Sequence, residues 1–204
     1  MGTLPRKLIE DTARELMTRA VTASGSSLTA RCRPSTRWCS HLTGIVIRPE
    51  AIQSARAHAL IAALNAELSA RYPEDGATHF RLDVDEVAPG RGAFLVAHVD
   101  GEAVGCGAIR RLDGDMAEIK RMYVRPAARG RGVGGALLAA LESEAHRLGV
   151  TRLVLETGER QPEALALYRG AGFVVIPAFG EYVDSPLSVC MGKELATSRT
   201  KSTG

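Results

Sequence analysis

A glycine-rich, basic segment has the clearest chemical potential in the chain. It follows an extended run that ends at Val124 and precedes an amphipathic helical pattern. Glycines let successive backbone N–H groups turn toward one point, and the unpaired amides at the start of a helix favour negative charge. The segment therefore predicts a pyrophosphate-binding loop made mainly by the main chain, with two arginines adding positive charge. Its residues are Arg129, Gly130, Arg131, Gly132, Val133, Gly134 and Gly135.

The same glycines also match the G-x-G-x-x-G fingerprint of dinucleotide-binding folds. Glu156 lies near the position at which such folds carry their ribose-binding acid. The residues before the loop argue against this interpretation, because a dinucleotide loop directly follows a buried apolar strand. Here the preceding run contains Lys120 and Arg121, and Pro126 separates it from the glycines. A P-loop is excluded, since no Gly-Lys-Ser/Thr follows.

Arg129-x-x-Gly132-x-Gly134 resembles the acyl-CoA pyrophosphate loop of the GNAT superfamily of N-acetyltransferases. The segment 161–173 resembles a second signature of that family, and the order of elements from about Gly44 to Leu195 matches as well. Gln161 stands where the family often has Asn, and Gly135 where a polar or basic residue is common. The resemblance implies an α/β (α+β) acyl-CoA N-acyltransferase fold, with a mixed, mostly antiparallel sheet flanked by helices, and acetyl-CoA as cosubstrate.

The resemblance also implies contacts along the strand before the loop. In GNAT proteins this strand splays from its neighbour and binds the pantetheine arm through freed backbone groups, so that the Met122 N–H would polarise the thioester oxygen. Alternation along an extended run places Glu118, Lys120, Met122 and Val124 on one face. The alternative is a strand paired on both sides. The expected cofactor contacts are Met122, Tyr123, Val124, the loop residues from Arg129 to Gly135, and Gln161.

Three residues are candidates for proton transfer. An amine acceptor is protonated at neutral pH, so the site needs a base. Glu118 matches a glutamate that some family members use as base, and its alternative role is a salt bridge to Lys120 or Arg111. Tyr168 matches the tyrosine that assists the leaving thiolate, and its alternative is a packed aromatic residue. Glu156 is a second candidate base or a ligand of the acceptor amine.

One domain is predicted over residues 44–195, with an N-terminal extension at 1–43 and a tail at 196–204. A chain of 204 residues that is 45% hydrophobic can bury one core of ordinary size. Residues 1–43 hold seven Lys/Arg against three Asp/Glu, so their net charge exceeds the +3 of the whole chain. We expect this extension to be flexible, with a short helix near residues 8–21.

Composition and spacing argue against several partners. No apolar run approaches the roughly 18 residues of a membrane span, and the N-terminus lacks a signal pattern, so we expect a soluble, cytoplasmic protein without a membrane partner. The basic extension has a single aromatic residue, Trp38, and no recognition-helix pattern, so nucleic acid is not expected. The histidines lack metal-ligand spacing and the cysteines form no C-x-x-C pair, so neither a metal site nor a disulfide framework is expected.

Three strands, 92–99, 105–111 and 116–124, are predicted to form an antiparallel meander, because Asp-Gly turns separate them. Tyr72 and Glu74 follow a long predicted helix and could either line the acceptor site or pack at the helix end. The step across the cofactor helix is parallel, which makes the sheet mixed. The other predicted elements are a strand at 45–48, helices at 51–70, 132–148 and 163–170, and strands at 152–156, near Phe173 and at 187–193.

The leading interpretation is an acetyl-CoA-dependent N-acetyltransferase that acts on a primary amine of a small molecule or, in second place, of a peptide. No Ser/His/Asp or Cys nucleophile pattern is evident, which agrees with direct attack in a ternary complex. The alternatives are a non-catalytic acyl-CoA sensor and a dinucleotide-binding oxidoreductase. A homodimer is compatible with the resemblance, because many relatives pair through their sheets.

Overall fold

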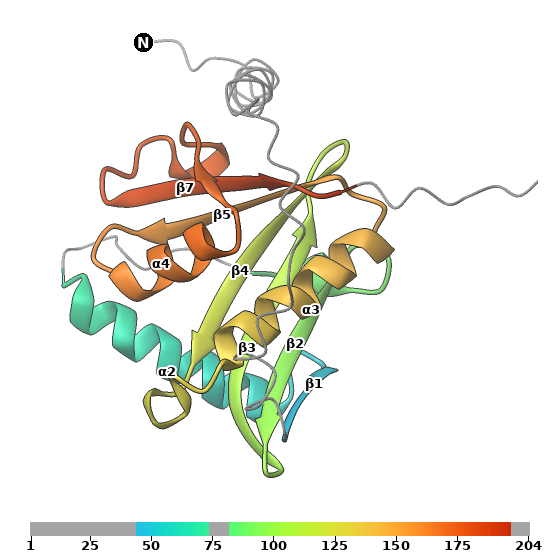
Figure 1. Ribbon diagram of the computed structural model, residues 1–204, viewed down its shortest axis with the longest axis vertical. Coiled ribbons are helices and arrows are strands. Elements are labelled where there is room, and N and C mark those ends of the chain that lie inside the picture. The colour runs from blue at the N-terminus through green and yellow to red at the C-terminus, as the bar shows by residue number, and fades with distance from the viewer. Residues whose placement is uncertain (1–43, 74–81, 197–204) are drawn as a thin grey trace, which may run out of the picture. The chain divides into compact units, whose positions relative to one another are not determined.

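The computed structural model describes residues 44–73 and 82–196 (Figure 1). Two compact units are distinguished: residues 156–192 form the smaller one, and the other described residues form the larger one. The predicted helix near residues 8–21, the extension at 1–43, Glu74 and the tail after residue 196 lie outside the described residues.

The larger unit contains the predicted antiparallel meander. Neighbouring strands pair antiparallel in the order β1 to β4, and β5 then pairs with β4 in parallel. The predicted limits of β2 and β4 are confirmed, and β3 begins earlier than predicted, directly after the Asp100-Gly101 turn. The elements are β1 (Ile45–Pro49), α2 (Ala55–Arg71), β2 (Gly92–Val99), β3 (Glu102–Arg111), β4 (Met116–Val124), α3 (Val133–Arg147) and the first part of β5 (Arg152–Gly158).

Helix α2 begins four residues later than predicted, for a local chemical reason. The Ser54 side chain accepts a hydrogen bond from the Ala57 N–H (3.0 Å) and so caps the first turn. The Ser54 hydroxyl also donates to Glu50 (2.6 Å), which holds the cap in place. The apolar residue Ile52 therefore lies before the helix and joins its core from a turn.

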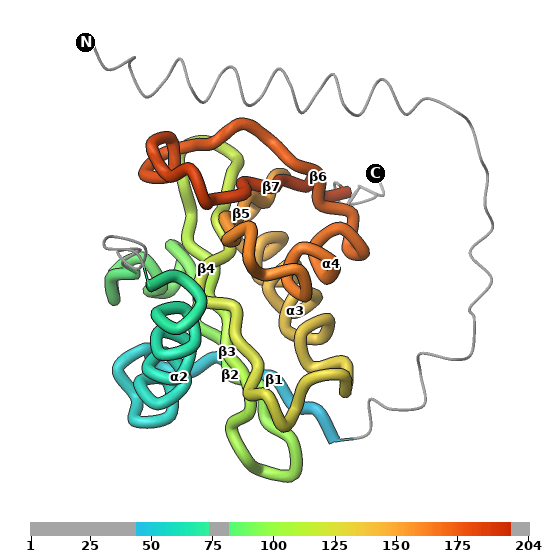
Figure 2. Tube along the Cα trace, turned by 90° about the vertical axis from the view of Figure 1, so that its left-hand side faces the viewer, coloured from blue at the N-terminus to red at the C-terminus, as the bar shows by residue number. Residues whose placement is uncertain are grey.

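The two long helices cover opposite faces of the sheet, as Figure 2 shows. Side chains from α2 pack with those of one sheet face in a buried cluster that includes Leu60, Phe94, Cys106 and Tyr123. Leu137 and Leu141 of α3 lie against the other face, close to the glycines of β3. Strand β4 thus lies between two packed layers, so each of its side chains is committed to one face or the other.

The smaller unit contains α4 (Pro162–Gly170), β6 (Val174–Val175) and most of β7 (Ser188–Glu194). Strand β7 pairs antiparallel with β6. The rings of Tyr168 and Phe173 meet at 5.8 Å between centroids. The hydrogen-bonded order of the strands in the described residues is β1-β2-β3-β4-β5-β7-β6, so the mixed sheet that the sequence predicts is confirmed.

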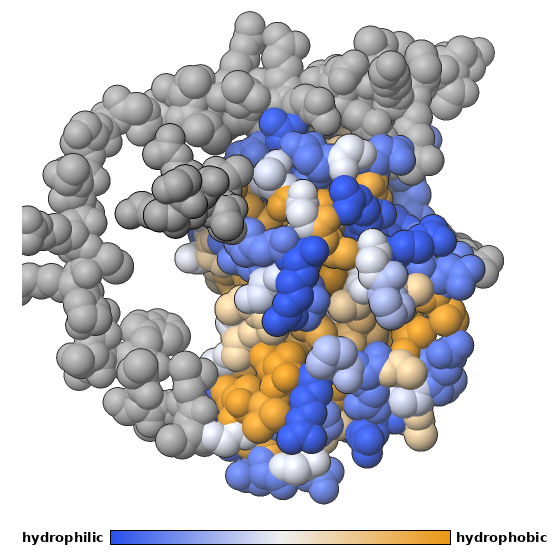
Figure 3. Space-filling model, turned by 90° about the vertical axis from the view of Figure 1, so that its right-hand side faces the viewer, coloured by the Kyte–Doolittle hydropathy of each residue, from blue (hydrophilic) through white to orange (hydrophobic). Residues whose placement is uncertain are grey.

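The surface of the described residues is mixed in character. On the face in Figure 3, patches of hydrophobic side chains lie between hydrophilic ones. Within the described ranges, no helix is long and apolar enough to cross a membrane, and no group of three or more His, Cys, Asp or Glu could hold a metal ion. The exposed large hydrophobic residues are Val46, Val84, Val174, Val175 and Val183.

Candidate active site

Strand β4 contains a bulge in its second half. Cys106 of β3 pairs with Tyr123 of β4, and Ala108 pairs with Lys120. An interval of two residues on β3 therefore lies opposite an interval of three residues on β4. Arg121, inside this interval, has a φ of 57°. A bulge inserts one residue and so reverses the alternation of side chains beyond it.

The bulge corrects one prediction about this strand. Lys120 and Tyr123 face the α2 side, because their partners on β3 belong to the α2 cluster. The Met122 side chain lies on the α3 side, since a Cβ on Gly107 would meet both its sulfur and Leu141. The expectation that Glu118, Lys120, Met122 and Val124 share one face was therefore wrong.

The second half of β4 pairs with β3 but lies beyond the last residue pair between β4 and β5. The ladder between β4 and β5 runs from the pair Met116–Arg152 to the pair Ile119–Leu155, whereas β4 continues to Val124. The Arg125 N–H donates to the Val104 carbonyl on β3 (2.8 Å). Successive amides alternate along a strand, so the Val124 N–H points to the opposite edge. An extended ligand could add to this edge as a strand does.

The glycine-rich loop from Arg129 to Gly135 leads into a helix N-terminus that has no side-chain cap. Gly132 is the N-cap of α3, with a φ of 84°, and α3 has neither a side-chain cap nor an acidic residue in its first turn. The Ala136 N–H donates to the Gly132 carbonyl (3.0 Å), which leaves the amides of the preceding residues of α3 without an acceptor inside the helix. A Cβ on Gly130, Gly132 or Gly135 would meet no atom within 4 Å. The loop therefore fits a pyrophosphate in charge, donors and space.

The side chains of the predicted cofactor residues divide into buried and exposed ones. Val133 and Tyr123 are buried, so their side chains are not available to a ligand. Arg131 is exposed. The Arg129 guanidinium is bound within the protein: its Nε donates to the Val124 carbonyl (2.9 Å) and its Nη2 to Glu67 (2.5 Å). Arg129 thus does not extend freely toward the loop, as a simple phosphate contact would require.

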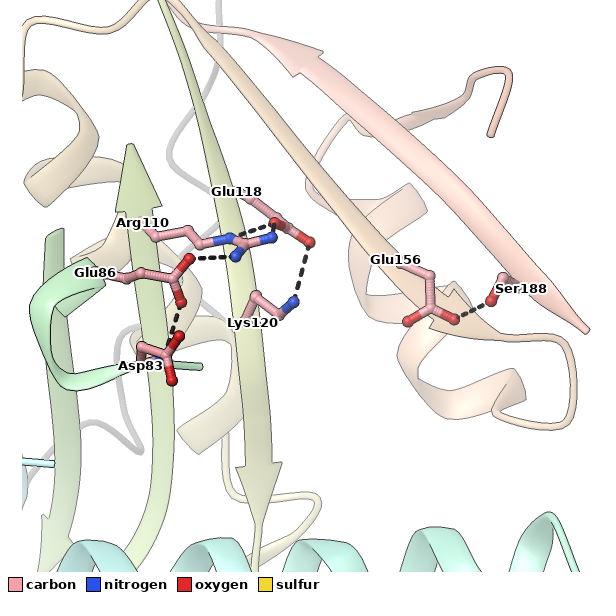
Figure 4. Close-up of polar contacts among 7 residues, drawn as sticks. All are labelled: Asp83, Glu86, Arg110, Glu118, Lys120, Glu156 and Ser188. Carbon is pink, nitrogen blue, oxygen red and sulfur yellow. Dashed lines mark hydrogen bonds and ion pairs between the residues drawn. The ribbon is translucent and has the colours of Figure 1, made fainter. Parts of the chain in front are cut away.

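Glu118 lies in a buried network of charges on the α2 side of the sheet (Figure 4). Its side chain is completely buried, and its Oε2 accepts from Arg110 Nε (2.7 Å) and contacts Arg110 Nη2 (2.6 Å). Lys120 Nζ lies 3.8 Å from Glu118 Oε1. Arg110 also binds Glu86, which in turn accepts from the Asp83 N–H (2.8 Å).

The network favours the charged forms of Glu86 and Arg110. Burial alone would raise the pKa of Glu86, but the Asp83 amide and Arg110 outweigh it, so that this pKa is lowered. Burial alone would lower the pKa of Arg110, but the two carboxylates raise it. The structure thus contains the salt bridge named as the alternative role of Glu118, with Arg110 in place of Arg111. Arg111 instead donates to the Leu148 carbonyl at the end of α3 (2.6 Å).

A second polar cluster lies in the smaller unit. Ser188 donates to Glu156 Oε1 (2.6 Å), and the Ser185 hydroxyl lies 2.8 Å from that of Ser188. Figure 4 shows the Ser188 hydroxyl directed at the Glu156 carboxylate. The buried Tyr168 ring has a raised pKa, because of its burial and of the Glu156 charge. No sequence pattern pointed to the two serines, because they lie far from Glu156 along the chain.

Two further residues named from the sequence, Gln161 and Tyr72, lie at helix ends. Gln161 is the N-cap of α4, where its carbonyl accepts from Ala164 and Leu165 (both 3.1 Å) and its side chain makes no capping bond. Tyr72 ends α2 and is buried, which favours the packing role over a position in the acceptor site.

Comparison with known proteins identifies the family. A sequence model of the Acetyltransferase (GNAT) family matches residues 57–173. The chain is 42% identical to an IAA acetyltransferase of Azospirillum brasilense over 137 residues, which is 67% of this chain and 88% of that protein. It is 37% identical to the uncharacterized N-acetyltransferase YjgM of Escherichia coli over 103 residues, 49% of this chain and 57% of YjgM.

Solved structures agree with this result. A structure assigned to the acyl-CoA N-acyltransferases, from Klebsiella pneumoniae, is 38% identical, with a TM-score of 0.66 over 74% of this chain and 98% of its own. A GNAT acetyltransferase from Elizabethkingia anophelis, solved with acetyl-CoA bound, shares the fold at 21% identity, with a TM-score of 0.54 over 74% and 99% of the two chains.

These matches decide between the interpretations of the glycine pattern. The dinucleotide-binding oxidoreductase is not supported, because the matching family model covers both the glycine loop and helix α4. The catalytic interpretation is preferred over a sensor, because the relatives are named as acetyltransferases. The chain belongs to the GNAT family and is an acyl-CoA-dependent N-acetyltransferase with acetyl-CoA as its cosubstrate.

Proposed function

We propose that the enzyme transfers the acetyl group of acetyl-CoA to a primary amine of a small molecule, by direct attack in a ternary complex. The observation that carries this proposal is the open cradle of main-chain amides at the start of α3, beside the free edge of β4. The name of the A. brasilense relative supports acetyl as the transferred group. A peptide amine is the second acceptor class, and a product screen with both classes distinguishes the two.

Direct attack is supported by the state of the described cysteines. Cys106 and Cys190 are buried. Burial raises the pKa of Cys106 to about 12. A thiol that stays protonated is a poor nucleophile, so Cys106 is not suited to hold an acyl group. Cys190 is not suited either, because it is buried. The amine nitrogen then attacks the thioester carbon itself, the new C–N bond forms, and the C–S bond breaks with its electron pair going to sulfur.

We assign the oxygen-polarising role to the Met122 N–H and the acceptance of the amine proton to Glu156. Glu156 carries a carboxylate that is partly exposed and bonded to a neutral hydroxyl. Glu118 is less suited, because its side chain is completely buried and its carboxylate is already paired with Arg110. In this proposal Glu118 holds β4 to β3, and Glu156 is the base that the sequence placed second.

Tyr168 is proposed to donate a hydrogen bond to the departing sulfur. Its raised pKa keeps the phenol protonated throughout the working range of the enzyme. The same shift makes complete proton transfer to the thiolate unfavourable, so the hydroxyl stabilises the leaving group while keeping its proton.

Tyr168→Phe is expected to lower kcat about 10-fold, the cost of one charge-assisted hydrogen bond, with little change in the KM for acetyl-CoA. Steady-state kinetics at several pH values measure this. Because Tyr168 does not ionise in that range, the shape of the pH profile should be the same in both proteins. A basic limb that disappears in the variant would contradict the proposed role.

The cradle itself can be tested at Gly132. Asp and Asn have similar size and both tolerate the left-handed conformation that this position requires (φ 84°). Both also cap helices, so both variants should fold. Gly132→Asp, however, places a negative charge where the pyrophosphate is proposed to lie. We expect it to weaken acetyl-CoA binding about 30-fold relative to Gly132→Asn, or roughly 2 kcal/mol.

Calorimetric titration with acetyl-CoA, and with NAD as control, measures this difference. Equal affinities in the two variants would show that the pyrophosphate does not lie at the start of α3. An amine screen with the wild-type protein then identifies the acceptor.

A further inference from the structure

The Arg129 side chain connects three parts of the larger unit. Its Nε binds the Val124 carbonyl at the end of β4 (2.9 Å), and its Nη2 binds Glu67 on α2 (2.5 Å). The centre of the guanidinium lies 5.9 Å from the centroid of the Tyr123 ring. One planar group therefore meets a carbonyl, a carboxylate and an aromatic face at the entrance to the phosphate loop.

Two side chains of helix α2, Asn65 and Glu67, bind arginines in and just after the second half of β4. Arg121, at the bulge, donates from Nη1 to Asn65 Oδ1 (3.1 Å). Glu67, two positions further along α2, holds Arg129 just beyond the end of β4. The stretch of β4 that extends past the β5 ladder is thus fixed from the side by one helix.

Glu67 is shared between two arginines. Besides Arg129 it binds Arg71 of its own helix (3.0 Å), at the i,i+4 spacing. Arg71 lies on the same helix as Glu67, so the pair Glu67–Arg71 provides an internal comparison for the pair Glu67–Arg129.

We infer that Glu67 is a positioning residue for acyl-CoA binding, which it serves by holding Arg129 on the Val124 carbonyl. The inference rests on the proposed location of the pyrophosphate. The Nε bond fixes the peptide that enters the loop, and Glu67 fixes the guanidinium that makes this bond. Arg129 in this role binds the protein, and the main-chain amides bind the phosphates. The role differs from a direct contact between Arg129 and the pyrophosphate.

The two roles of Arg129 predict opposite effects of one substitution. If Arg129 binds the phosphates, Glu67 competes for it, and Glu67→Gln should tighten acetyl-CoA binding. If Glu67 positions Arg129, Glu67→Gln should weaken binding. We expect a weakening of about five-fold, the usual upper value for a partly exposed ion pair.

The substitution Arg129→Lys also distinguishes the positioning role of Arg129 from a direct contact with the phosphates. Lysine keeps the charge but lacks the fork that reaches a carbonyl and a carboxylate together. The positioning role predicts that Arg129→Lys weakens binding as much as Arg129→Gln. A direct phosphate contact predicts that lysine retains most of the affinity.

The test is calorimetric titration of the full chain with acetyl-CoA at two salt concentrations. Arg71→Gln is the matched control, because it removes the other partner of Glu67, and it should keep the affinity within two-fold. Circular dichroism checks that each variant is folded. Unchanged or tighter binding in Glu67→Gln overturns the inference. If the wild type binds acetyl-CoA but Gly132→Asp and Gly132→Asn bind equally well, the proposed pyrophosphate location fails instead, so the two failures are distinguishable.

Discussion

Glu156→Gln is expected to lower kcat by about 100-fold or more, with a smaller change in the KM for acetyl-CoA. Loss of a general base typically costs 10²–10⁴-fold, because the amine must then release its proton to water. The substitution keeps the size of the side chain and an oxygen that can accept from Ser188 (2.6 Å in the wild type). The structural cost should therefore be small. Initial rates with saturating acetyl-CoA and an amine acceptor measure the effect.

The pH profile gives this prediction a second readout. The wild type should lose activity at acidic pH as its base becomes protonated, and Glu156→Gln should lack this acidic limb. Ser188→Ala is the matched control, because it removes a hydrogen bond to the ionised carboxylate while leaving the carboxylate in place. We expect it to shift the acidic limb to higher pH with a modest loss of kcat. A Glu156→Gln enzyme with wild-type rates would exclude Glu156 as the base.

Local sequence patterns predicted the elements of this fold well. The Asp100-Gly101 turn is a clear example: both residues have positive φ (52° and 85°), as the hairpin turn requires. The glycine loop was placed correctly before its helix because Gly132 suits the left-handed N-cap position. These features depend on residues that are adjacent in the chain, so short-range physics decides them.

The errors came from contacts between distant segments. Alternation along β4 failed because the strand carries an extra residue near Arg121, which pairing with β3 reveals and the sequence of β4 does not. Arg129 was predicted to contact the cofactor, and its bond to Glu67 could not be foreseen, because Glu67 lies far away in the sequence. The Ser188–Glu156 pair was missed for the same reason. The sequence therefore indicated which groups are available but could not say which of them are already paired.

Glu118→Gln is expected to lower the free energy of unfolding by about 3 kcal/mol, and to affect catalysis mainly through stability. Removing one partner from a buried ion pair typically costs 3–5 kcal/mol, since the other charge stays buried without compensation. The Lys120 side chain is 4% exposed and its ammonium lies 3.8 Å from Glu118. A Gln at position 118 could still form a hydrogen bond with Arg110, but it could not balance the positive charges of Arg110 and Lys120. Urea denaturation, followed by circular dichroism, measures the loss.

Two variants test the cause of this loss. Glu86→Gln removes the more exposed carboxylate of the network, whose side chain is 26% exposed, and should cost about 1 kcal/mol or less. Lys120→Met, added to Glu118→Gln, removes the uncompensated ammonium and should restore part of the lost stability. These outcomes would establish Glu118 as the central charge that holds β3, β4 and the Val84–Val87 turn together. A Glu118→Gln protein with wild-type stability and a 100-fold lower kcat would instead return the role of base to Glu118, because only a group that touches the reacting amine has that signature.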